Sequence, residues 1–170
     1  IADSKTKSAP EILHLYHQGQ RLFGENKVQE LTEKQAILPL DIEWHLIGHL
    51  QRNKVKFIAP FVGMIHSVDS EKLLAEINKE AMKNERIIPC LLQIHIADEE
   101  TKFGFSPDEV MDLLKQHKLQ NFPNVAICGL MGMATNTENE VQITQEFASL
   151  KTLFDTLNET FFSGNPHLKE

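Results

Sequence analysis

The stretch Ile88–Ile96, which reads IPCLLQIHI, decides the fold class. It is rich in apolar and β-branched residues and predicts a strand that is buried on both faces, as the strands of parallel sheets are. Five shorter runs of this kind alternate with amphipathic stretches along the chain. The strands are expected at Ile1–Ser4, Arg21–Phe23, Glu43–Ile47, Met64–Val68, Ile88–Ile96 and Val125–Leu130. Helices are expected at Pro10–Gln18, Lys27–Leu38, Asn53–Ala59, Ser70–Asn84, Ser106–His117 and Glu138–Thr160.

About six strand–helix units in succession require a parallel α/β sheet, because each helix carries the chain back across the sheet. An open doubly wound sheet and a closed (β/α)8 barrel both satisfy this pattern. No Gly-x-Gly-x-x-Gly follows the first strand, which disfavours the dinucleotide-binding version of the open sheet. A complete barrel has eight units and about 250 residues, so this chain is two units short.

The composition is that of one globular domain spanning residues 1–170. The net charge of −7 disfavours broad electrostatic binding to nucleic acid or to an anionic membrane. No apolar run is long enough to span a bilayer. Cys90 and Cys128 lie in apolar runs without the spacing of a zinc site, and they predict buried free thiols in a reducing, cytoplasmic setting.

Chemically useful residues gather where the expected strands end. Lys5 follows the first strand, Asn26 the second, His45 belongs to the third, and Met131 follows the sixth. The carboxyl ends of barrel strands form the mouth where active sites lie, and a lysine there can form a Schiff base. Each residue also has an ordinary interpretation: a solvated turn for Lys5, a helix cap for Asn26, and core packing for Met131. Their shared position is what indicates a ligand site.

Five motifs together resemble a known family. They are Ser4–Lys7, Phe23–Glu30, Trp44–Lys54, His66–Asp69 and Gly129–Met133, and they read SKTK, FGENKVQE, WHLIGHLQRNK, HSVD and GLMGM. In this order and spacing they resemble the pyridoxal phosphate homeostasis proteins, whose barrel is similar to the N-terminal domain of alanine racemase. The resemblance extends from Ser4 to about Phe161.

The resemblance implies a barrel that holds pyridoxal 5′-phosphate at its mouth, with Lys5 as the lysine of the internal aldimine. It places Asn26 in the lining of the cofactor site, and His45 and Met131 near the cofactor ring. Members of the family are described as non-catalytic proteins that buffer or deliver the cofactor. Apoenzymes that depend on pyridoxal phosphate are the expected acceptors, and the expected state is a monomer.

This chain departs from the family pattern in two respects. The family has an apolar residue where this chain has Asp3, whose carboxylate is expected either to perturb Lys5 or to point elsewhere. The family also has an N-terminal helix and a seventh and eighth strand, which supply most phosphate contacts. We therefore expect the barrel to be incomplete at both ends of the given sequence.

Three other functions fit parts of the sequence. A racemase of the alanine racemase type needs a second acid–base group, and the chain has one tyrosine, Tyr16, within the first expected helix. A Schiff-base lyase of the aldolase kind usually carries its lysine on a later strand. An interaction protein with a degenerate site predicts no specific loss when Lys5 is replaced.

Overall fold

The computed structural model describes residues 1–97 and 103–163. Its centre is a six-stranded sheet in the order β1-β2-β3-β4-β5-β6, with every neighbouring pair parallel. The strands are β1 (Ala2–Asp3), β2 (Leu22–Glu25), β3 (Glu43–Leu46), β4 (Met64–Val68), β5 (Ile88–Ile94) and β6 (Val125–Gly132). Each strand pairs with the next one in sequence, which is the order of a (β/α) barrel and differs from that of a doubly wound sheet. The predicted fold class is therefore confirmed.

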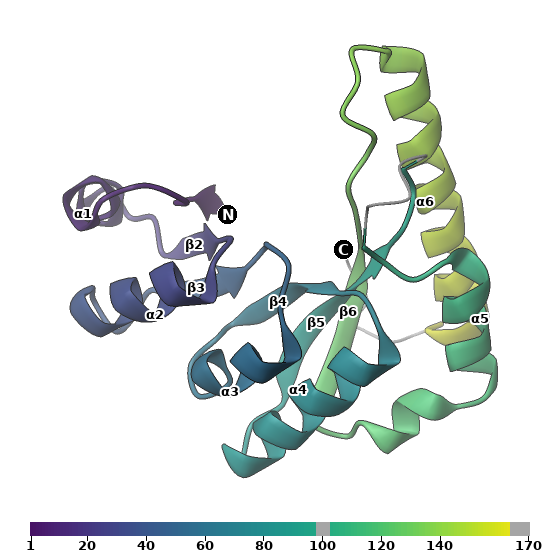
Figure 1. The fold of residues 1–170 in the computed structure, drawn as a ribbon, viewed down its shortest axis with the longest axis horizontal. Coiled ribbons are helices and arrows are strands. Elements are labelled where there is room, and N and C mark those ends of the chain that lie inside the picture. The colour runs from purple at the N-terminus through teal and green to yellow at the C-terminus, as the bar shows by residue number, and fades with distance from the viewer. Residues whose placement is uncertain (98–102, 164–170) are drawn as a thin grey trace.

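Helices connect successive strands. They are α1 (Ala9–His17), α2 (Val28–Ile37), α3 (Val55–Ile58), α4 (Glu71–Lys83), α5 (Pro107–Lys115) and α6 (Glu140–Phe161), with short 3-10 helices η1 (Arg52–Lys54) and η2 (Lys118–Asn121). Figure 1 shows α2, α3 and α4 along one side of the sheet, while α5 and α6 stand beside β6. The described sheet is open, with β1 and β6 at its two edges.

The hydrophobic core lies between the sheet and these helices. Leu31 of α2, Leu73 and Ile77 of α4, and Ile65 of β4 are almost completely buried in one cluster. A one-residue shift would turn a strand's apolar residues away from the helices, so this packing fixes which face of each strand points away from the helices.

Several helix starts agree with the sequence. Ser8, Ser70 and Ser106 are the N-cap residues of α1, α4 and α5, as their positions before apolar-periodic stretches predict. Two boundaries differ. Strand β2 continues through Gly24 to Glu25, two residues beyond its expected end at Phe23. Lys27, and not Asn26, precedes the first turn of α2, so the capping interpretation of Asn26 is wrong.

Cys90 is a buried free cysteine, and Cys128 is partly buried. Burial raises the pKa of the Cys90 thiol, so this thiol is protonated at neutral pH. Within residues 1–97 and 103–163, no helix is both long enough and apolar enough to cross a membrane. The expected break after α6, from Ser163 to Pro166, lies mostly outside the described residues.

Candidate functional site

Lys5 lies two residues beyond Asp3, the last residue of β1, and 55% of its side chain is exposed. Its Nζ is 3.2 Å from Asp3 Oδ2, and its backbone N–H donates to Asp3 Oδ1 at 3.1 Å. The carboxylate that departs from the family pattern is thus directed at Lys5. An ion pair this exposed contributes at most about 1 kcal/mol to stability, so its main effect is to place a negative charge beside the Lys5 amine.

The turn after Lys5 has an unusual backbone. Thr6 has a φ of 61°, in the left-handed region that β-branched residues rarely adopt. Its N–H donates to Glu30 Oε2 of α2 at 3.2 Å, and the N–H of Lys7 donates to the carbonyl oxygen of Ser4 at 3.0 Å. The hydrogen bond from Thr6 lowers the pKa of Glu30, which keeps this carboxylate charged.

Asn26 follows β2 and is partly buried. It lines a hollow of about 360 Å³ together with His49, Gln51 and Lys54. Its backbone packs tightly against the end of β3, because a Cβ atom at Gly48 would lie 2.4 Å from the Asn26 carbonyl oxygen. Glycine is therefore required at position 48 for β2 and β3 to approach this closely.

His45 is buried in β3 and joins two other polar side chains. Its Nε2 lies 3.2 Å from Glu43 Oε1, and its Nδ1 lies 2.8 Å from Nε2 of His66 on β4. A carboxylate only accepts, so His45 Nε2 carries a hydrogen; with neutral rings, His66 Nε2 then donates to His45 Nδ1. Burial, with a contribution from His45, lowers the pKa of His66 to about 4, which makes His66 neutral at pH 7.

The pairing register shows which residues near β1, β2 and β3 share a face. The Glu25 side chain contacts Lys34 of α2 and accepts a hydrogen bond from the Ser4 hydroxyl, so both side chains face the helices. Residues alternate along a strand, so Asp3 and Gly24 face the opposite side, and His45 pairs with Gly24 on that same side. Lys5 and Asn26 lie just beyond the carboxyl ends of β1 and β2, at the same edge of the sheet.

Met131 of β6 lies on the same face as His45, as the register across β4 and β5 shows. Ile65 pairs with Cys90, and two residues along β5 Leu92 pairs with Leu130. These residues share the face opposite Met64, the residue that pairs with His45. Met131 follows Leu130 and is therefore on the side of His45, although β6 lies at the far edge of the sheet from β1 (Figure 1).

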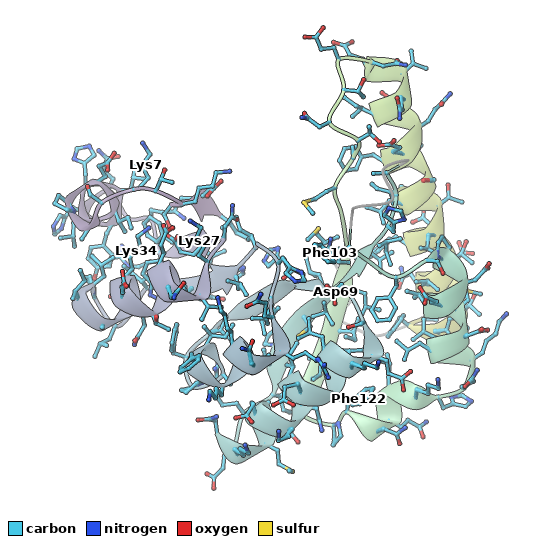
Figure 2. The ribbon with its side chains drawn as sticks, in the orientation of Figure 1. Lys7, Lys27, Lys34, Asp69, Phe103 and Phe122 are labelled. Atoms are coloured by element: carbon cyan, nitrogen blue, oxygen red, sulfur yellow. The ribbon has the colours of Figure 1, made fainter. Side chains whose placement is uncertain are left out.

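A second hollow, of about 660 Å³, lies over the carboxyl ends of β3 and β4. His49 stacks on Phe103, with ring centroids 4.1 Å apart, and its Nδ1 is 3.3 Å from Asp69 Oδ2. Figure 2 labels Phe103 and Asp69 beside each other near the centre of the molecule. Arg52 and Lys72 complete its charged lining with Asp69 and Glu76.

Sequence reasoning missed two groups near the candidate site. The ion pair of Glu25 and Lys34 lies directly under the Lys5 turn, and His66 is hydrogen-bonded to His45. Lys34 lies three residues after Leu31 and four before Leu38, on the buried stripe of α2, and this spacing is the sequence signal for its burial. The His66 motif was visible in the sequence, but its contact with His45 arises from pairing between strands.

Comparison with known proteins gives the family. The family model described as alanine racemase, N-terminal domain, matches residues 2–165. A pyridoxal phosphate homeostasis protein of Aquifex aeolicus is 39% identical over 169 residues, which cover 99% of this chain and 73% of that protein. The chain belongs to the pyridoxal phosphate homeostasis protein family.

Solved structures agree with this assignment. PipY of Synechococcus elongatus, at 34% identity, matches this pyridoxal phosphate homeostasis family chain with a TM-score of 0.88 without pyridoxal phosphate and 0.83 with it bound. The matches cover 98% and 99% of this chain and 76% of the PipY chain. Alanine racemase of Clostridium difficile matches at 14% identity with a TM-score of 0.69, covering 93% of this chain and 41% of the racemase, which shows a shared fold.

Proposed function

We propose that this chain binds pyridoxal 5′-phosphate through a Schiff base to Lys5 and releases it to other proteins without catalysing a reaction. The observation that carries the proposal is the position of Lys5: an accessible amine on a fixed turn at the carboxyl edge of β1. PipY, a structural relative at 34% identity, has been solved with pyridoxal phosphate bound, which supports the same ligand here.

The residues present fit part of this cofactor. Lys5 supplies an amine, Asn26 an amide, His45 a buried imidazole and Met131 a thioether. This set suits an aldehyde and an aromatic ring, and it leaves the phosphate to other groups. The cofactor supplies an aldehyde carbon, and the Lys5 nitrogen bonds to that carbon with loss of one water molecule. Water or another amine reverses the bond and leaves Lys5 as the free amine.

A two-base racemase reaction is a poor fit to this chain. Tyr16, the one tyrosine, lies on α1, and its hydroxyl donates to Asp41 at 2.7 Å. The Arg21 guanidinium covers its ring at 3.9 Å. Tyr16 therefore serves a surface contact between α1 and the loop before β3. A sensitive assay for D-alanine formed from L-alanine tests this conclusion, and we expect no turnover by the loaded protein.

The binding proposal is tested by mixing the protein with pyridoxal phosphate, removing the excess and recording the absorption spectrum. We expect the wild type and Lys7→Ala to retain a Schiff-base absorption band. Lys5→Ala should lose at least nine-tenths of this band, which corresponds to about tenfold less retained cofactor than in the wild type. Lys7→Ala is a matched control, because Lys7 lies on the same turn and is equally exposed. Equal retention by Lys5→Ala would contradict the proposal, and no retention by any protein would favour an interaction protein.

Delivery needs a separate test. We propose a monomeric cytoplasmic carrier, consistent with the free buried thiol of Cys90, whose acceptors are apoenzymes that require pyridoxal phosphate. The loaded protein should reactivate such an apoenzyme faster than spontaneous dissociation of the cofactor from the loaded protein would allow. Identical rates would show that the chain only buffers the cofactor, and light scattering would test the monomeric state.

A further inference from the structure

A buried ion pair lies beneath the turn that carries Lys5. The Glu25 side chain is fully buried at the end of β2, and 11% of the Lys34 side chain on α2 is exposed. Lys34 Nζ is 2.5 Å from Glu25 Oε1 and donates to the Ser4 carbonyl oxygen at 2.8 Å. The Ser4 hydroxyl donates to the same Glu25 oxygen at 2.6 Å. Figure 2 labels Lys34 on α2, below the loop on which Lys7 is labelled.

Stability alone does not account for this ion pair. Desolvating each ion costs several kcal/mol, and replacing a buried pair by apolar residues is often neutral or stabilising. The second Glu25 oxygen, Oε2, is buried without a hydrogen-bond partner among the described residues, which adds to the cost. What the pair does contribute is a fixed donor for the carbonyl group immediately before Lys5.

The same helix holds the residue after Lys5. Glu30 Oε2 accepts the hydrogen bond from the Thr6 N–H at 3.2 Å and lies 3.6 Å from Lys34 Nζ. A β-branched residue at a φ of 61° costs about 1–3 kcal/mol, and such strain persists only where surrounding contacts enforce it. Backbone strain of this kind gathers at ligand sites, and here it adjoins Lys5.

Lys5 is therefore fixed on both sides by α2, through the Ser4 carbonyl group and the Thr6 amide group. We propose that Glu30 and Lys34 are positioning residues, which fix the backbone of Lys5 so that its amine meets the aldehyde of pyridoxal phosphate at the face of His45. This inference rests on the proposed function. It predicts that Lys5 reacts faster than an equally exposed lysine, and that it loses this advantage when the α2 contacts are removed.

Lys7 provides the internal reference, because 56% of its side chain is exposed against 55% for Lys5. The full chain is treated briefly with limiting pyridoxal phosphate, reduced with borohydride and sequenced by mass spectrometry. The readout is the ratio of Lys5 to Lys7 modification. If exposure alone governed reaction, this ratio would be about 1; misplacing a reacting group by about 1 Å costs up to about a hundredfold, so a fixed Lys5 should exceed Lys7 by at least about tenfold.

Glu30→Ala removes the acceptor for Thr6 at a partly exposed position and should lower the ratio by about tenfold. Glu30→Gln retains an oxygen acceptor and should keep most of the wild-type ratio of Lys5 to Lys7 modification. Lys34→Met combined with Glu25→Gln removes the donor to Ser4 without leaving a buried charge unpaired, and it should also lower the ratio. Glu33→Ala, an exposed acid of the same helix, should leave the ratio unchanged.

Urea unfolding of each variant shows that the measured protein is folded. A wild-type ratio near 1 overturns the inference even if cofactor is retained. Wild-type selectivity that survives in both Glu30→Ala and the double variant also overturns it, while leaving the proposed function intact. Absence of any Lys5 adduct in the wild type overturns the proposed function and the inference together.

Discussion

At the scale of single residues, Lys5 and Lys7 differ in their partners although they are equally exposed. Lys5 forms an ion pair with Asp3, the last residue of β1, whereas Lys7 forms one with Glu11 on α1 at 3.3 Å. The pKa of Glu11 is lowered to about 2 by hydrogen bonds from Ser8 and by Lys7. Lys7 is therefore paired at the start of α1, and Lys5 at the carboxyl end of β1.

His66 should make stability depend on pH. Its pKa falls from 6.5 to about 4 in the folded chain, so the unfolded chain binds more protons between these values. Stability should be unaffected by this group above about pH 6.5 and should fall as the pH drops toward 4. Allowing for its partial exposure, the loss is about 1–2 kcal/mol.

Urea unfolding at pH 7 and pH 4.5 measures this loss. His66→Gln retains a donor toward His45 and does not titrate, so its stability should fall by less between the two pH values. An identical pH dependence in the wild type and the variant would show that His66 is not the group responsible.

The candidate residues were recognisable in the sequence because each belongs to a motif at a strand end. The shared side of His45 and Met131 follows from the register, and the roles of all four residues, Lys5 and Asn26 included, remain predictions. The contacts of Lys34 with Glu25 and Ser4 were not recognisable, because they depend on how α2 packs on β1 and β2. Whether Asp3 points toward Lys5 also required the structure.

At the scale of secondary structure, helix starts are the best-predicted features. Ser106 accepts a hydrogen bond from the Glu109 N–H at 3.2 Å, and Glu109 Oε2 accepts one from the Ser106 N–H at 2.8 Å. This reciprocal cap can be read from the sequence, because it depends on residues three apart.

Ser106→Ala should therefore destabilise the chain by about 1 kcal/mol, measured as a lower urea midpoint with an unchanged slope. Ser149→Ala, inside α6, is the control, because Ser149 only donates to the Glu146 carbonyl oxygen and caps no helix start. If the two variants were equally stable, the Ser106 cap would have no measurable role.

Strand ends were predicted less well than helix starts. The sequence FGEN suggests a turn from Gly24, yet β2 continues to Glu25, which pairs with Leu46 of β3. Strand β6 likewise extends to Gly132, two residues beyond the apolar run that predicted it. Both extensions come from pairing with a neighbouring strand, which single-strand patterns do not contain.

At the scale of the whole molecule, the alternation of strands and helices was enough to predict a parallel sheet. The choice between a barrel and a doubly wound sheet required the strand order, which only pairing reveals. Sequential pairing brings Lys5, Asn26 and His45 onto neighbouring strand ends. Met131 reaches the same face from β6 at the opposite edge.

Cofactor binding should stabilise the whole fold. A ligand at about 100 times its Kd adds about 2.7 kcal/mol to the free energy of unfolding, which corresponds to a Tm rise of about 5–10 °C at this size. The wild type should show this rise with pyridoxal phosphate in a thermal unfolding experiment, and Lys5→Ala should show little or none. A rise of equal size in Lys5→Ala would mean that binding does not need the Schiff base.

The central claim, that Lys5 holds the cofactor on this face of the sheet, is tested most directly by a crystal structure of the chain with pyridoxal phosphate. We predict continuous electron density from Lys5 Nζ to the aldehyde carbon, with the ring on the side of His45. Density joined to another lysine, or a cofactor bound on the helix-covered face, would contradict the claim.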